Sequence, residues 1–158
     1  MFSGKNSYSI DEKGRVPIPP EFVKELGGGK AEVNVVLTIG PNDDCILVYP
    51  ENEWESFREE LEKLPLEKKI ELHPFIRLIF SRVVIRKIDA QRRISIPEEM
   101  QEKIGLGKKA VVIGCNKSFE IWDEEKWKEA EVETEKELHI KGKTLFGTLL
   151  SQSLIYRN

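Results

Sequence analysis

The sequence of 158 residues contains few of the residues from which metal and disulfide sites are built. It has two cysteines and two histidines, and neither Cys45 nor Cys115 belongs to a Cys-x-x-Cys pair. A disulfide framework and a zinc ribbon are therefore not expected, and a multi-histidine metal site within one chain is excluded. No nucleophile stands at a known spacing from a base. We therefore assign no catalytic residue, no metal and no cofactor, and we expect that the chain is not an enzyme.

Long apolar runs are also missing. No run of about 18 or more apolar residues occurs, so a transmembrane helix is not expected. The first fifteen residues contain no apolar segment, which argues against a signal peptide. With 39% hydrophobic and 34% charged residues, the composition is that of a soluble, compact, cytosolic protein.

The net charge of −3 hides a strong segregation of charge along the chain. The segment Arg77–Arg93 carries six cations against one anion, whereas Asn116–Ile140 carries nine carboxylates against four lysines. Local fields decide which partners a surface attracts. The first segment is suited to an anionic partner, and the second is expected to stay acidic and solvated.

The chain contains an internal repeat. Residues Ile10–Gly27 align with Ile88–Gly105, and Cys45–Trp54 align with Ser118–Trp127. Shared Asp, Arg, Ile, Pro, Glu, Gly and Trp residues keep matching spacings in both copies, which indicates a duplication. We expect a first repeat at residues 1–64, a connecting helix at 65–81 that packs against the preceding helix, and a second repeat at 82–131. The tail, 132–158, is expected to be flexible or ordered only by a neighbouring subunit.

Each copy is predicted to form a strand, a tight turn, a strand, a short helix, two further strands and a longer helix. Helices are expected to start at Pro20, Pro50 and Pro97, and the first is expected to end at Gly27. The fold class is α+β. The two strand-turn-strand elements are expected to interlock into a barrel-like core with approximate two-fold symmetry and with helices outside.

Both copies carry an Asp-x-x-x-Arg motif, Asp11 with Arg15 and Asp89 with Arg93. The turn brings the two side chains of each pair together, and a guanidinium can hold a carboxylate through two parallel hydrogen bonds. In one interpretation the pair only stabilises the turn. In the other, the arginine keeps spare donors that the turn presents to phosphates or guanine edges.

From Met1 to about Trp127 the chain resembles the MraZ family. The resemblance rests on four stretches, MFSGKNSYSIDEKGRVPIPPEF, IDAQRRISIP, CILVYPENEW and FEIWDEEKW. The resemblance implies a swapped-hairpin fold similar to AbrB-type proteins. It also implies a bacterial, nucleoid-associated transcriptional regulator that forms ring-shaped homo-oligomers. Such proteins bind short repeats upstream of the division and cell wall gene cluster.

This sequence departs from the family pattern at two positions. Arg92 stands where the family usually has glycine, and Val23 stands where an arginine often follows the aromatic residue of the first helix. A residue other than glycine at positive φ costs about 1 kcal/mol, so we expect a change of turn type at Arg92 together with one additional cation.

The leading hypothesis is therefore a sequence-specific DNA-binding transcriptional regulator that recognises repeats in its own promoter. Asp11 and Asp89 are expected to orient the arginines. The residues expected to contact DNA are Lys5, Lys13, Arg15, Arg86, Lys87, Arg92 and Arg93. The alternative is a protein-interaction scaffold or antitoxin-like module of the same fold, whose acidic segment binds a partner protein.

Overall fold

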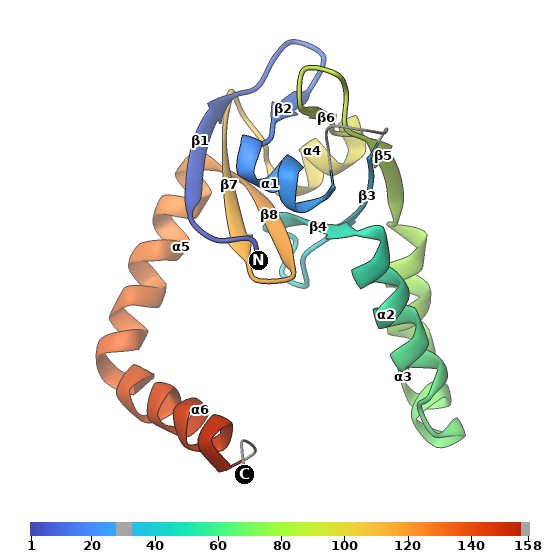
Figure 1. The fold of residues 1–158 in the computed structure, drawn as a ribbon, viewed down its shortest axis with the longest axis vertical. Coiled ribbons are helices and arrows are strands. Elements are labelled where there is room, and N and C mark those ends of the chain that lie inside the picture. Colours follow the sequence, from blue (N-terminus) through green and yellow to red (C-terminus); the bar gives the residue numbers. More distant parts are fainter. Residues whose placement is uncertain (28–32, 156–158) are drawn as a thin grey trace. The chain divides into compact units, whose positions relative to one another are not determined.

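The computed structural model describes residues 1–27 and 33–155 of the chain. The residues group into two compact units, Met1–Glu124 and Glu125–Asn158. The first unit contains every strand of the described ranges (Figure 1).

Both copies of the repeat run through the same order of elements. The first copy contains β1 (Lys5–Ser9), β2 (Arg15–Pro17), α1 (Pro20–Glu25), β3 (Asn34–Ile39), β4 (Cys45–Pro50) and α2 (Glu51–Glu62). After α3 (Leu66–Ser81), the second copy contains β5 (Val84–Lys87), β6 (Arg93–Ser95), α4 (Glu98–Ile104), β7 (Lys109–Cys115), β8 (Ser118–Asp123) and α5 (Glu124–Glu137). The predicted order of strands and helices is confirmed.

Proline and glycine set the ends of the short helices. Pro19 and Pro97 are the N-caps of α1 and α4, where the missing backbone N–H removes no helical hydrogen bond. Gly105 ends α4 with φ of 63°, a left-handed conformation in which glycine is not strained. Gly27, with φ of 84°, follows α1, and the expected continuation of that glycine run at Gly28 lies outside the described residues.

The strands of the two copies exchange partners. The large sheet is antiparallel with the order β1-β7-β8-β4-β3-β5, so β1 of the first copy pairs with β7 of the second. In the same way β5 of the second copy pairs with β3 of the first. The short strands β2 and β6 pair only with each other, as a separate two-stranded ribbon (Figure 1).

The predicted α+β class is confirmed, but no closed barrel is found among the described strands. The large sheet ends at β1 on one side and at β5 on the other. Proline limits the ribbon that would have to bridge these edges. Within the ribbon the N–H groups of Ile18 and Ile96 face the partner strand, so position 17 faces outward, where Pro17 has no N–H to pair with a further strand.

The core is built from equivalent residues of both copies. Val16 of β2 and Ile94 of β6 lie opposite each other and have no exposed surface. Phe22 of α1 and Met100 of α4, which match in the repeat, are buried in the same cluster. The sheet contributes alternate residues to this cluster, namely Val35, Leu37, Ile46, Val48, Ala110, Val112, Phe119 and Ile121.

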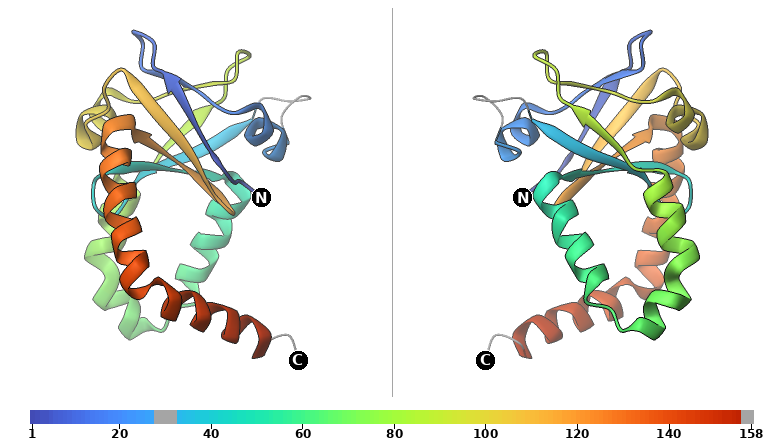
Figure 2. Two further views of the ribbon diagram at one scale, coloured as in Figure 1. Left: turned by 90° about the vertical axis from the view of Figure 1, so that its left-hand side faces the viewer. Right: turned by 90° about the vertical axis from the view of Figure 1, so that its right-hand side faces the viewer.

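Helices α2 and α3 extend from the sheet on the side away from the β1–β2 and β5–β6 turns (Figure 2). The ring of Trp54 in α2 lies 5.6 Å from that of Tyr49 and 5.7 Å from that of Phe80 in α3. The Nζ atom of Lys69 in α3 lies 3.3 Å from Oε2 of Glu62 in α2. These contacts confirm the predicted packing of the connecting helix against the helix before it.

The second unit is helical as far as Ile155, and the expectation that the tail is flexible or ordered by a neighbouring subunit stays a prediction. After α5 the chain forms a π-helical turn, η1 (Leu138–Gly142), and then α6 (Lys143–Ile155). Glu, Lys and Leu favour helix formation, and they are abundant in this segment. Gly142 is buried in the π-helical turn, where a Cβ atom would collide with the side chain of Leu138. Among residues 1–27 and 33–155, none of the helices has the length and apolar character that a bilayer crossing requires.

The ribbon should carry a large share of the stability of the first unit. Replacing Ile94 with alanine removes a fully buried side chain, and we expect the free energy of unfolding to fall by about 2–5 kcal/mol. The matched control is Ile85→Ala in β5, where the isoleucine is 59% exposed and the change should stay within about 0.5 kcal/mol. Urea denaturation measures both, and equal losses would contradict this account of the core.

Candidate nucleic-acid interface

The β2–β6 ribbon brings the two Asp-x-x-x-Arg turns to one end of the first unit. The backbone N–H of Ile18 donates to the carbonyl of Arg92 over 2.8 Å, and the N–H of Ile96 donates to the carbonyl of Gly14 over 2.9 Å. Each turn is therefore hydrogen-bonded to the residue that follows the ribbon strand of the other copy. Figure 2 shows both turns projecting from the same end of the unit, where they diverge from each other.

In the first turn, one carboxylate organises both the backbone and the arginine. Oδ1 of Asp11 accepts hydrogen bonds from the N–H groups of Lys13 and Arg15, both over 3.0 Å. Oδ2 accepts one from Nε of Arg15 over 2.5 Å. The N–H of Gly14 donates to the carbonyl of Asp11, and Gly14 adopts φ of 70°. A tight turn followed by a left-handed residue is a common hairpin geometry.

The second turn has the same geometry, so the expected change of turn type is wrong. Oδ1 of Asp89 accepts from the N–H groups of Gln91 and Arg93 over 2.9 Å, and Oδ2 accepts from Nε of Arg93 over 2.8 Å. Arg92 occupies the left-handed position with φ of 60°. The hydrogen bonds of Asp89 and the link to Ile18 hold the backbone in this shape, and they offset the conformational cost of a residue with a Cβ atom.

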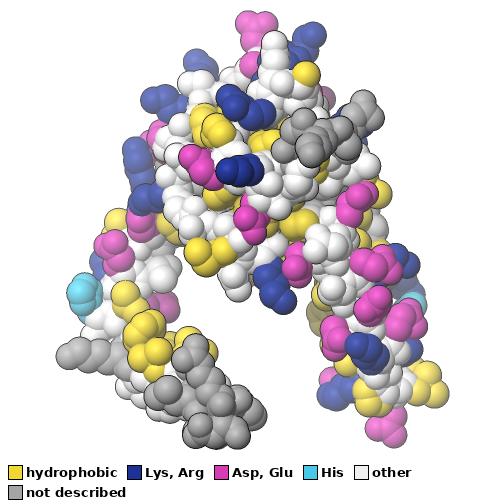
Figure 3. Space-filling view, in the orientation of Figure 1, with side chains coloured by type: hydrophobic (Ala, Val, Ile, Leu, Met, Phe, Trp, Pro, Cys, Tyr) yellow, Lys and Arg dark blue, Asp and Glu magenta, His cyan; other side chains and the backbone are white. Residues whose placement is uncertain are grey.

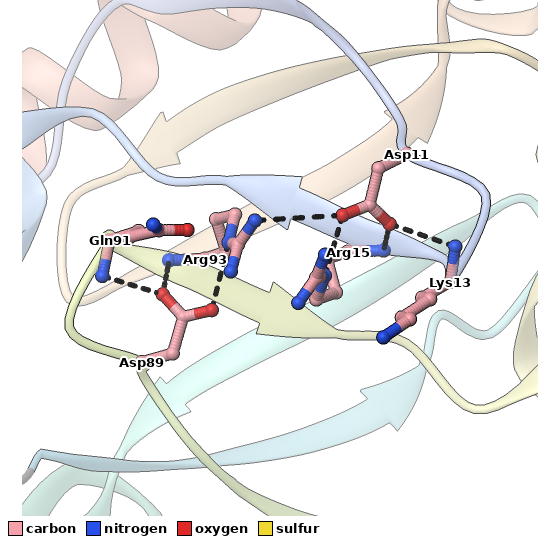
Figure 4. A network of polar contacts seen from close by, with 6 residues as sticks. All are labelled: Asp11, Lys13, Arg15, Asp89, Gln91 and Arg93. Atoms are coloured by element: carbon pink, nitrogen blue, oxygen red, sulfur yellow. Dashed lines mark hydrogen bonds and ion pairs between the residues drawn. The ribbon is translucent and has the colours of Figure 1, made fainter.

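The four side chains form one charged network across the ribbon (Figure 4). Besides its own carboxylate, Arg93 approaches Asp11, with 3.7 Å between Nη1 and Oδ2. The exposed fraction is 30% for the Arg15 side chain and 24% for that of Arg93. Within the described part of the chain, Nη1 and Nη2 of Arg15 have no hydrogen-bond partner. Each arginine is therefore oriented by a carboxylate while donors remain for a ligand.

The turns shift the acidity of their carboxylates. The backbone N–H of Arg15 has the largest effect on Asp11, and with the Arg15 side chain it lowers the pKa of Asp11 below the ordinary 3.8. Desolvation raises the pKa of Asp89, but hydrogen bonds from Arg93 and Gln91 outweigh it and leave that pKa lowered too. Both carboxylates therefore stay ionised, with their arginines paired, at neutral pH.

The structure brings some of the other predicted contacts to the turns and leaves others away from them. Lys13 and Arg92 are exposed on the two turns, and Lys87 is exposed where β5 enters the second turn. Arg86 is half-buried, because Nε donates to the carbonyl of Ser95 over 3.2 Å and Nη1 to that of Ile85 over 3.1 Å. Lys5 begins β1, so it lies four residues before the strand end at the first turn, or about 13 Å along the strand.

Two lysines beside the first turn were missed by the sequence analysis. Lys108 and Lys109 lie next to the end of β1, because the N–H of Ile10 donates to the carbonyl of Lys108 and Ser9 pairs with Lys109. The only signal in the sequence was a pair of lysines just before a predicted strand. Figure 3 shows Lys and Arg side chains, with some carboxylates among them, around the end of the unit that carries the turns.

The chemistry of this surface is hydrogen-bond donation to anions. Among the described residues, no three His, Cys, Asp or Glu side chains are arranged to hold a metal ion.

The sequence matches the family model described as "MraZ protein, putative antitoxin-like" over residues 1–72 and 79–148. The chain belongs to the MraZ family.

Three relatives in this family are named "Transcriptional regulator MraZ". The protein of Natranaerobius thermophilus is 41% identical over 127 residues, that of Ligilactobacillus salivarius 39% and that of Syntrophomonas wolfei 35%. Each match covers 80% of this chain and 84% of the relative. MraZ proteins are regulators and not enzymes, which confirms the prediction that this chain is not an enzyme.

Replacing Arg92 with glycine should stabilise the second turn. We expect Arg92→Gly to raise the free energy of unfolding by up to about 1 kcal/mol, because it relieves a side chain at positive φ. The reciprocal change Gly14→Ala should lower it by more than about 1 kcal/mol. There φ is also positive, and a Cβ atom would collide with the side-chain amide of Gln101. Chemical denaturation measures both, and a destabilising Arg92→Gly would refute this reading of the turn.

The lowered pKa values predict a definite acid response. The hydrogen bonds of Asp11 and Asp89 stabilise the fold above the ordinary pKa of 3.8, and this contribution is lost as the pH falls through the lowered folded values. The variant Asp11→Asn/Asp89→Asn keeps an oxygen acceptor in each turn but no charge. It should lose less stability than the original protein between about pH 5 and about pH 2.

The control for this measurement is Glu12→Gln, since this carboxylate is exposed on the first turn. Its loss of stability over the same pH range should follow that of the original protein. Thermal unfolding followed by circular dichroism at each pH gives the comparison. Identical acid curves for all three proteins would show that the turn carboxylates contribute nothing.

Proposed function

We propose that this MraZ protein is a sequence-specific, DNA-binding transcriptional regulator. The observation that carries the proposal is the pair of equivalent turns at one end of the unit, each presenting a guanidinium that a carboxylate already orients. Orientation before binding lowers the entropy lost on contact. Arginine can donate two parallel hydrogen bonds to guanine O6 and N7 or to a phosphate.

The proposed roles differ among the side chains of this surface. Arg15 and Arg93 contact DNA, while Asp11 and Asp89 hold them in position and do not touch the duplex. Lys13 and Arg92 extend the cationic surface over the two turns. Further out, the contacts would come from Lys5, Arg86 and Lys87.

We also propose that the protein acts as a homo-oligomer, as a ring of subunits that meets several repeats in its own promoter. Two turns supply few contacts, so useful affinity needs several subunits on several DNA repeats. Exposed apolar side chains support an assembly, since large exposed apolar patches mark interaction sites. They include Leu66, Ile70, Phe75 and Leu78 of α3 and Leu145, Phe146 and Leu149 of α6.

The family resemblance suggests the biological setting. We propose that the promoter repeats lie upstream of the division and cell wall gene cluster, and that the protein is cytoplasmic and associated with the nucleoid. Within the chain, residues 1–64 and 82–131 would act as the two AbrB-like repeats, joined by 65–81 and followed by the tail 132–158. The exchange of β1 and β5 between the copies supports a swapped-hairpin origin of the fold.

A second candidate function is a protein-interaction scaffold or antitoxin-like module. It is favoured by the acidic segment Asn116–Ile140 and by the antitoxin-like description of the family. Salt separates the two candidates. Binding of a regulator to DNA weakens steeply as salt rises, because released counterions drive it, whereas a scaffold shows little DNA binding at any salt.

The double variant Arg15→Ala/Arg93→Ala tests the proposed site. We expect it to lose the preference for a duplex of its own promoter over a shuffled duplex, since the oriented guanidiniums are gone, while fold and assembly persist. Fluorescence anisotropy gives the affinities, and light scattering gives the assembly. The control is Arg58→Ala/Lys63→Ala, which removes two cations held in ion pairs on and beside α2. Loss of assembly in the double variant, or unchanged preference, would mean that the pairs are only structural.

A further inference from the structure

A second set of cations lies beside the first turn, in a hollow. Of the residues proposed above to contact DNA, Lys13 lines this hollow. The turn at residues 11–14, the end of β1, the start of α4 and the loop before β7 line this hollow. Three exposed lysines contribute to its wall, namely Lys13, Lys108 and Lys109. Within the described part of the chain, none of their ammonium groups forms an ion pair.

The backbone that carries Lys108 and Lys109 is held from three directions. The N–H of Leu106 donates to the carbonyl of Gln101 in α4 over 2.8 Å, and the N–H of Gly107 donates to Oδ1 of Asp123 over 3.0 Å. On the other side, the N–H of Ile10 donates to the carbonyl of Lys108 over 2.9 Å. The two lysines therefore stand on a fixed support next to the Asp11 turn, and only their side chains lose freedom when a ligand binds.

The charges of the hollow favour an anion on its lysine side. Asp11 forms an ion pair with Arg15, so the negative charge of its carboxylate is compensated. Glu98 lies in the first turn of α4, where the helix dipole stabilises a carboxylate, and Glu12 lies on the turn itself. Lys108 and Lys109 are neighbours on the strand side of the hollow. A polyanion that reaches the first turn can pass along that side.

We propose that this hollow binds the sugar-phosphate backbone of duplex DNA, with Lys108 and Lys109 holding phosphates that neighbour the site contacted by the first turn. The inference rests on the proposed function. Lysine offers a compact charge on a flexible stem, which suits phosphate better than the edge of a base. The two lysines therefore add affinity and salt dependence, and they add no sequence preference.

The test is the variant Lys108→Gln/Lys109→Gln, titrated against the promoter duplex and a shuffled duplex at several salt concentrations. Lost phosphate contacts reduce the slope of log K against log salt by about 0.9 each, or about 2 for every subunit on the duplex. We expect this reduction on both duplexes, with the ratio of the two affinities unchanged. The control is Lys63→Gln/Lys68→Gln, which removes two ammonium groups that are ion-paired to carboxylates of α2 and α3.

The outcomes separate this inference from the proposed function. A slope equal to that of the control variant would overturn the phosphate site, and so would a loss of affinity confined to the promoter duplex. If the unsubstituted protein binds both duplexes equally, sequence-specific regulation fails, while the slopes still decide whether the lysines hold phosphates. If it binds neither duplex, both proposals fall.

Discussion

The antiparallel pairing of β2 with β6 is the contact on which the rest of the first unit depends. It spans three residue pairs, and at its centre Val16 and Ile94 are fully buried. Because the two strands come from different copies of the repeat, neither copy can complete this contact alone. The same pairing, through the hydrogen bonds of Ile18 and Ile96, fixes the two turns at opposite ends of the ribbon, with Arg15 and Arg93 between them. A short ribbon thus links the duplication, the core and the candidate interface.

The Asp–Arg pairs connect local folding to the binding surface. In each turn one carboxylate accepts from two backbone N–H groups and from the arginine, so the atoms that shape the turn also aim the guanidinium. The structural and the functional interpretations of the motif are therefore compatible. Arg92 adds a cation in a left-handed conformation that costs stability, and conformations of this kind tend to persist where they serve a site.

Much of this arrangement was predictable from the sequence, because it depends on neighbouring residues. The spacing of Asp89 and Arg93 predicted their ion pair, and Pro97 predicted the start of α4. Strand partners depend on contacts distant in the sequence, so the open edges at β1 and β5 could not be predicted from it. The position of Lys109 beside the first turn could not be predicted for the same reason, because it results from the pairing of Ser9 with Lys109. At Arg92 the intrinsic preference of the residue was a poor guide, because hydrogen bonds to Asp89 and from Ile18 outweighed it.

The central claim is that the paired turns recognise DNA by sequence. The most direct measurement is a fluorescence-anisotropy titration of the unsubstituted protein at two salt concentrations, with its own promoter region and a shuffled duplex of equal length as probes. The account predicts tight binding with a clear preference for the promoter duplex and a steep loss of affinity at the higher salt. Equal and weak binding to both duplexes would contradict it and would direct attention to protein partners of the acidic segment.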